Sequence, residues 1–249
     1  MPDATLIPVS SRCFFLPNNP TADRPCLGVV RGDRLTLRVD AGNSPDHSAL
    51  MERLMRSQGL PEAGLLALTH SHWDHTYGMS ALRCPAVACR ETQAQLERMG
   101  RWRWTPEAMA HRLETGEDIR FCHDAMLVEY PDPTVIRVRT ADVVFDDHLT
   151  LDLGGVHAEL LRLPNSHAAD CVVVLVPEER VIFTGDICYE DLHHTPPCVH
   201  TRRYRALQEA LKALDFDMAV PGHQPALTKA ALLQDMEDAL PEIGLLLDD

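Results

Sequence analysis

The chain has 249 residues, of which 45% are hydrophobic and 24% charged, and its formal net charge is -14. This composition is ordinary for a soluble globular protein, and the length allows one large domain with a sizeable core. The acidic balance disfavours nucleic acids and anionic membranes as partners, because both are bound through basic surfaces.

Two further features bear on the compartment. Residues 1–20 lack the basic stretch, apolar core and cleavage site of a secretory signal, and no apolar run reaches membrane-spanning length. The eight cysteines are scattered without a C-x-x-C pair, which indicates reduced thiols rather than a disulfide framework. We therefore expect a cytoplasmic protein.

The first third of the chain is predicted to alternate short strands with one helix. Runs at 27–31 and 35–40 have the character of strands, and the Arg31–Arg34 segment between them is a hairpin signal. Residues 46–58 carry apolar side chains at helical spacing and end at a glycine. Further strands are expected at 65–69 and 86–90.

A polar, helical pattern covers about 91–117, and Pro106 can open a second helix within it. Strands are then expected at 135–138, 149–153, 156–163, 171–176, 181–184 and 218–220, and helices at 202–214 and 228–240. Two strand-rich halves, each flanked by helices, predict a single α/β domain over 1–249 with a four-layer αββα sandwich.

The segment 69–75 reads T-H-S-H-W-D-H and follows directly on a predicted strand. His70 and His72 are separated by one residue, so both imidazoles can point the same way. Asp74 and His75 bring a carboxylate and a third imidazole close by. Imidazole nitrogens and carboxylate oxygens are the ligands that zinc prefers, so this segment predicts a metal site.

Three later residues have the same ligand chemistry. His167, Asp186 and His223 each stand just after a predicted strand, in P-N-S-H, F-T-G-D and P-G-H respectively. Loops at strand ends gather above a rigid sheet, where side chains from distant parts of a chain can meet.

The order H-x-H-x-D-H, then His, then Gly-Asp, then Gly-His resembles the metallo-β-lactamase superfamily, from the strand that ends at Asp40 to His223. The resemblance implies that His70, His72 and His167 hold one divalent metal ion and that Asp74, His75 and His223 hold a second. Asp186 would bridge the two. Zinc is the expected metal, and iron or manganese is compatible with the same ligands. Asp40 matches an acidic residue that orients a metal ligand in this family, or it caps the turn before Gly42.

Departures from particular branches narrow the expected chemistry. Flavodiiron relatives carry a carboxylate where this chain has His72, and zinc β-lactamases have Cys or Ser near the position of Asp186. Glyoxalase II relatives share the seven ligands, but their substrate-binding Lys and Tyr have no counterpart in 187–195. Tyr189 stands three residues after Asp186, as in lactonases whose tyrosine hydroxyl reaches the carbonyl; the alternative is a tyrosine packed on the core.

The expected function is therefore a dinuclear metal-dependent hydrolase of a carboxylic ester, lactone or thioester. Two such ions lower the pKa of a shared water from 15.7 towards about 7, which supplies hydroxide at neutral pH. Asp74 would ligate a metal and carry the proton to the leaving group, and Tyr189 would polarise the carbonyl. Alternatives are a phosphodiesterase and a non-catalytic metal- or ligand-binding module. The expected partner is a small-molecule substrate.

The stretch from His75 to His167 is longer than compact relatives need, and the helical segment at about 91–117 fills it as a predicted insertion. It could form a lid or the contact of a homodimer. Trp102, Trp104 and Met109 would then line an apolar pocket, or they would pack the insertion onto the body of the protein. Cys188 is interpreted as a small packed residue, and the loop residues His193, His194 and His200 are not assigned a catalytic role.

Overall fold

The structure is a computed structural model that describes residues 4–240 and 246–247. The first of its two large sheets is mixed and runs in the order β1 (Ile7–Pro8), β2 (Cys13–Leu16), β3 (Leu27–Arg31), β4 (Thr36–Val39), β5 (Leu65–Ala67), β6 (Ala86–Cys89) and β7 (Val143–Phe145). Neighbours are antiparallel from β1 to β4 and parallel from β4 to β7.

The second sheet runs in the order β14 (Leu227–Thr228), β13 (Met218–Pro221), β11 (Val181–Gly185), β10 (Val172–Val176), β9 (His157–Arg162) and β8 (His148–Asp152). Its one parallel pair is β11 with β13. A small third sheet pairs β12 (Val199–His200) with β15 (Leu246–Leu247).

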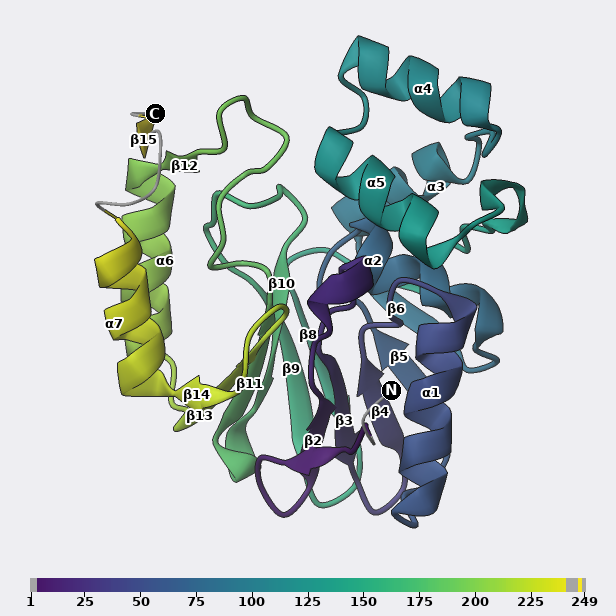
Figure 1. Ribbon diagram of the computed structural model, residues 1–249. Helices are drawn as coiled ribbons and strands as arrows, with labels where there is room; N and C mark the ends of the chain where they lie inside the picture. Colours follow the sequence, from purple (N-terminus) through teal and green to yellow (C-terminus); the bar gives the residue numbers. More distant parts are fainter. Residues whose placement is uncertain (1–3, 241–245, 248–249) are drawn as a thin grey trace.

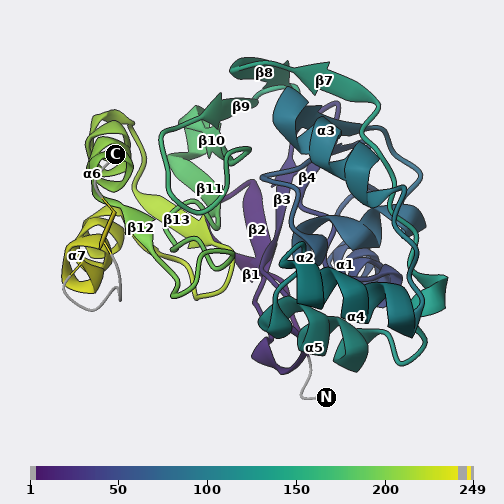
Figure 2. The ribbon, with the colours of Figure 1, turned by 90° about the horizontal axis from the view of Figure 1, so that it is seen from above.

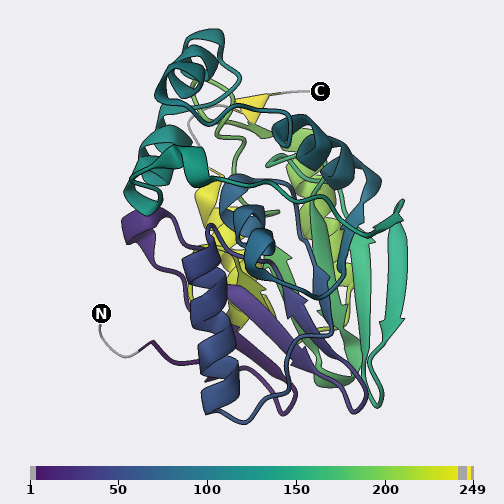
Figure 3. The same ribbon diagram turned by 90° about the vertical axis from the view of Figure 1, so that its right-hand side faces the viewer.

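Helices cover the outer faces of the two sheets (Figures 1 and 2). They are α1 (Pro45–Ser57), α2 (Trp73–Thr76), α3 (Arg90–Met99), α4 (Pro106–Thr115), α5 (Arg120–Glu129), α6 (Thr201–Ala213) and α7 (Lys229–Ala239), with short 3-10 turns η1 (Pro20–Ala22), η2 (Tyr77–Ala81), η3 (Pro133–Val135) and η4 (Pro177–Glu179). Figure 3 shows α1 lying along the first sheet, with α4 and α5 above it.

Alternation along the strands explains the layers. In β10, Val172, Val174 and Val176 face the core between the two sheets, whereas Val173 and Leu175 pack against α6 and α7. The outer face of the first sheet packs against α1 in one place and against the segment from α2 to α5 in another. The fold is thus an αββα sandwich, as the sequence predicts.

The sequence prediction is wrong at 135–138, where no strand forms. Pro133 instead begins η3, and the carboxylate of Asp132 accepts a hydrogen bond of 3.0 Å from the backbone N–H of Thr134. Proline fixes φ and suits the first position of such a turn, and this local signal prevails over the β-branched residues that follow.

The helical segment also differs from its predicted bounds. The segment contains a helix that begins at Pro106, but its helical structure extends past residue 117 through a further helix, α5, which ends at Glu129. Trp104 and Met109 are buried in the core that joins this segment to the first sheet. Its status as an insertion, and its role as a lid or dimer contact, stay predictions.

All eight cysteines are free thiols, as predicted. Within the part of the chain that the structure describes, no helix has the length and apolar character needed to cross a membrane.

Candidate metal centre

The fold brings the predicted ligands together at the carboxyl ends of strands. The segment with His70 to His75 follows β5, and His167 follows β9. Asp186 comes directly after β11, and His223 comes shortly after β13. Because β9 and β11 are both antiparallel to β10, and β13 is parallel to β11, the carboxyl ends of β9, β11 and β13 lie at the same edge of the second sheet.

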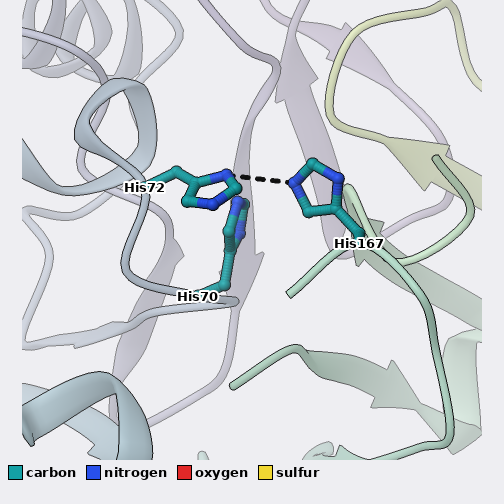
Figure 4. A group of neighbouring side chains, drawn as sticks. All are labelled: His70, His72 and His167. Atoms are coloured by element: carbon teal, nitrogen blue, oxygen red, sulfur yellow. Dashed lines mark hydrogen bonds between the residues drawn. The ribbon is translucent and has the colours of Figure 1, made fainter. Parts of the chain in front are cut away.

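His70, His72 and His167 form the first cluster (Figure 4), with one candidate ligand atom from each within 4.8 Å of the others. Nδ1 of His72 lies 3.0 Å from Nε2 of His167. Nδ1 of His167 lies 2.9 Å from the carbonyl oxygen of Glu190, so this ring donates there and leaves Nε2 for another partner. Burial, followed by the charge of His167, lowers the pKa of His72 to about 3.

Asp74, His75, Asp186 and His223 form the second cluster, again within 4.8 Å. Oδ2 of Asp74 lies 3.1 Å from Nε2 of both His75 and His223. Burial opposes protonation of His223, but the charges of Asp186 and Asp74 outweigh it and raise its pKa to about 10. The pKa of His75 is raised in the same way, against burial, by Asp74, Asp186 and Asp40.

Asp186 lies between the two clusters. Its Oδ2 is 3.3 Å from Nε2 of both His75 and His223, and 3.9 and 3.7 Å from Nε2 of His70 and His167. One carboxylate oxygen thus faces histidines of both clusters. Gly222 is required for this approach, since a Cβ there would lie 1.9 Å from Oδ1 of Asp186.

The donor set fits two metal ions. Nε2 of His70, Nε2 of His75 and Oδ1 of Asp186 are buried and have no hydrogen-bond partner among the described residues. Leaving such atoms unpaired is costly, and a divalent cation would pair with each of them. Mixed imidazole and carboxylate ligands suit zinc, iron and manganese alike.

Asp40 contacts one candidate ligand directly and the residue that precedes another. Its carboxylate accepts hydrogen bonds of 2.8 Å from both the backbone N–H and the hydroxyl of Thr69, and Oδ2 lies 2.7 Å from Nδ1 of His75. The same threonine hydroxyl lies 3.1 Å from Nδ1 of His70. Of the two interpretations of Asp40, contact with a candidate ligand is the one that the geometry favours.

A second carboxylate beside the ligands has no counterpart in the sequence-based prediction. Oδ1 of Asp23 lies 3.5 Å from Nδ1 of His223. Burial and the nearby charge of Asp74 raise the pKa of Asp23 to about 7. Asp23 ends η1 with a φ of +52°, and neither a motif nor its spacing in the sequence connects it with His223.

A cavity of about 380 Å³ opens over the two clusters and is lined by His72, His167, Asp186, Tyr189 and His223, among others. The Tyr189 hydroxyl accepts a hydrogen bond of 3.2 Å from the backbone N–H of His223. The hydroxyl proton has no acceptor among the described residues, so it is free to be donated into the cavity. Burial, with the charge of Asp186 next, raises the pKa of Tyr189 well above its ordinary value.

The remaining residues singled out in the sequence take different places. Cys188 packs against the core of the second sheet and is not part of either ligand cluster. His193 lines the cavity, and its ring centroid is 5.5 Å from that of His72. Nδ1 of His194 lies 2.8 Å from the carbonyl oxygen of Pro196, and the backbone N–H of His200 donates to the Ser166 hydroxyl.

The comparisons with known proteins agree with this geometry. The family model of the metallo-beta-lactamase superfamily matches residues 28–223, which include every candidate ligand. The comparison with curated protein sequences gives no match.

Among solved structures, the chain is similar to a metallo-beta-lactamase from Pontibacter korlensis, with 18% identity, a TM-score of 0.65, and coverage of 94% of this chain and 98% of that one. A metallo-beta-lactamase variant from Cronobacter sakazakii gives 14% identity, a TM-score of 0.66 and coverage of 96% of both chains.

A double mutant of the sec-alkyl sulfatase PisA1 gives 16% identity and a TM-score of 0.63 over 94% of this chain, but only 41% of that protein. At these identities the likeness concerns the fold alone. The family match spans most of the chain and both ligand clusters, and the chain therefore belongs to the metallo-beta-lactamase superfamily.

Proposed function

We propose that this protein is a dinuclear metal-dependent hydrolase that cleaves carboxylic esters, lactones or thioesters. The observation that carries the proposal is the position of Asp186, whose Oδ2 lies 3.3–3.9 Å from Nε2 of four histidines drawn from both clusters. A carboxylate between two dications offsets their mutual repulsion, and zinc is the first metal to test.

When bound, such a pair of ions lowers the pKa of water and attracts a carbonyl oxygen. The protein's own groups supply the rest. The protonated hydroxyl of Tyr189 donates a hydrogen bond to the carbonyl oxygen as negative charge develops there. Asp74, which lies in the wall of the same cavity, accepts a proton and returns it to the leaving group.

The lining of this cavity favours a carbonyl over a phosphodiester. Among the described residues that line it, there is no lysine or arginine. A phosphoryl group would bring more negative charge, which cationic side chains usually neutralise. A phosphodiesterase is therefore the second candidate, and a non-catalytic binding module is the third. A cytoplasmic location and a homodimer stay predictions.

The test is metal analysis followed by a substrate panel. We expect close to two transition-metal ions per chain, and turnover of esters, lactones or thioesters that exceeds turnover of phosphodiesters, sulfate esters and β-lactams. Elemental analysis that finds one ion or none in metal-replete protein would rule out the dinuclear site.

Asp186→Asn tests the bridge, because the amide keeps the shape of the side chain but loses its charge. We expect one or both ions to bind more weakly and turnover to fall steeply. Asp235→Asn is the matched control, since Asp235 is an exposed aspartate on α7. Unchanged metal content and turnover in Asp186→Asn would remove Asp186 from the site.

A further inference from the structure

A second cavity, of about 370 Å³, lies beside the one over the metal centre. His72, Cys122, His167 and His193 line both cavities, so the two adjoin at the first ligand cluster. A substrate whose carbonyl sits over the metal centre can therefore extend a side group into this space. The space is large enough for a group of several carbon atoms.

Aromatic and sulfur-containing side chains form much of the wall of the second cavity. Trp73 and Tyr77 contribute from the segment after β5, Met99 and Trp102 from the end of α3 and just beyond it, and Met126 from α5. Such a wall suits an apolar chain or spacer. The helical segment thus supplies part of the surface that a substrate would touch.

The charges in this wall are mostly negative. Arg98 is the one lysine or arginine among the described lining residues, and its Nη1 lies 4.0 Å from Oε1 of Glu117. The carboxylates in the wall are those of Glu91, Glu117, Asp118, Asp170 and Asp191. A negatively charged side group would be repelled here, whereas a cation would be attracted.

Among these carboxylates, Glu91 pairs with Arg162 through Oε1 and leaves Oε2 buried without a partner, and Asp118 leaves one oxygen buried in the same way. Asp170 accepts hydrogen bonds from the backbone N–H of Ser71 and the hydroxyl of Thr92. Asp118 is only 7% exposed, and its Oδ1 accepts one hydrogen bond, of 2.8 Å, from the N–H of Ile119. Its Oδ2 has no partner among the described residues.

Burial raises the pKa of Asp118, and the charge of Arg112 opposes that rise. Nε and Nη2 of Arg112 are themselves buried without hydrogen-bond partners among the described residues. The guanidinium of Arg112 lies 4.6 and 4.7 Å from the ring centroids of Trp102 and Trp104, and no ion pair joins it to Asp118 among the described residues. A buried carboxylate oxygen without a donor is costly, so a donor supplied by a bound molecule would stabilise Asp118.

We propose that this second cavity is a specificity pocket for a primary ammonium group, which Asp118 pairs with at the end of an apolar spacer. The inference rests on the proposed function for its substrate class: an ester, lactone or thioester whose side group ends in an amine. An ammonium is favoured over a hydroxyl because it supplies both the missing hydrogen bond and the charge that this wall attracts.

The kinetic test compares two p-nitrophenyl esters on the metal-loaded enzyme: the ω-aminohexanoate and the uncharged hexanoate. We expect the amino ester to have the higher kcat/KM. Asp118→Asn should reduce the ratio of the two kcat/KM values by a factor on the order of ten to a hundred, mainly through KM. The asparagine oxygen can still accept the N–H of Ile119, so this variant should keep the fold, which a thermal melt checks.

Asp124→Asn is the control, because it makes the same change of charge on the exposed surface of α5, outside the pocket lining. It should leave the ratio unchanged. A ratio that is the same in the wild-type protein and in Asp118→Asn would overturn the pocket assignment while leaving the hydrolase intact.

A binding measurement separates the two proposals if no ester is cleaved. Calorimetric titration with hexylamine and hexanol should show tighter binding of the amine, and Asp118→Asn should weaken amine binding by a factor on the order of ten or more. Amine binding without any hydrolysis would support the pocket and contradict the proposed function. Equal binding of the amine and the alcohol would overturn the ammonium assignment.

Discussion

Asp40→Asn is the substitution that tests most directly how the protein holds its candidate metal ligands in position. Asp40 is 2% exposed, and its carboxylate contacts Thr69 twice and His75 once. Its φ of +62° is a left-handed conformation that asparagine tolerates and alanine does not. Asparagine therefore removes the charge without adding backbone strain.

The expected loss follows from the contact with His75. In the wild-type protein Nδ1 of His75 can donate to Asp40, which leaves Nε2 as the lone-pair donor that faces Asp74 and Asp186. In the asparagine variant, an amide NH₂ facing Nδ1 of His75 would repel the N–H there. Otherwise it would favour the tautomer with the proton on Nε2, which cannot bind a metal through that atom. Outer partners of metal ligands are typically worth 10–100-fold in affinity, which is about 1.4–2.7 kcal/mol.

The assay is competition with a chromogenic chelator, which resolves the two ions by affinity. We expect the ion held by Asp74, His75 and His223 to bind about 10–100-fold more weakly, and the other ion to be affected less. Asp235→Asn serves again as the control, and the melting temperature of the metal-free variant reports on folding. Wild-type affinity at both sites would refute the role of Asp40.

Two further predictions concern the same site. Tyr189→Phe removes only the hydroxyl, so it should lower ester or lactone turnover by a factor on the order of ten to a thousand without changing metal content; an enzyme that cleaves phosphodiesters well and ignores this loss would overturn the substrate class. Metal binding at Asp74, His75 and His223 should strengthen as pH rises towards about 10. The pKa values of His75 and His223 are raised, so both imidazoles must lose a proton before they can bind a metal ion, whereas His72, with a pKa of about 3, is already neutral. Calorimetry in buffers of different ionisation enthalpy measures that release, and equal proton release for both ions would contradict the assignment.

The grouping of the candidate metal ligands can be predicted from the sequence because its signal is local. Four of the candidate ligands fall within 70–75, and the other three each follow a strand whose apolar pattern is plain. Turn chemistry is equally legible at α1, where the Ser44 hydroxyl accepts the N–H of His47 and Pro45 occupies the first turn. These features depend on residues close together in the chain.

Other elements escape prediction because their signals are weak or conflict. β7 has only three residues, and two of them, Val143 and Val144, are exposed on an edge strand. The start of α5 lacks a side-chain cap, since Ile119 stands at that position. At 135–138 the β-branched pattern favours a strand, but Asp132 and Pro133 favour the 3-10 turn that forms at 133–135.

The role proposed for Asp118 could not be predicted from the sequence, and the reason bears on substrate specificity. An aspartate near a helix is common in any acidic chain, and nothing in its sequence neighbourhood distinguishes it from Asp124. It becomes informative only when packing buries it beside His193 and leaves Oδ2 without a donor. The candidate metal ligands lie on strand-end loops whose positions the two sheets fix. Half of the residues that line the proposed ammonium pocket, Asp118 among them, lie within 90–130, in the helical segment rather than on these loops. Substitutions at Asp118 or Trp102 should therefore alter which substrate binds while leaving the metal affinity of the strand-end loops unchanged.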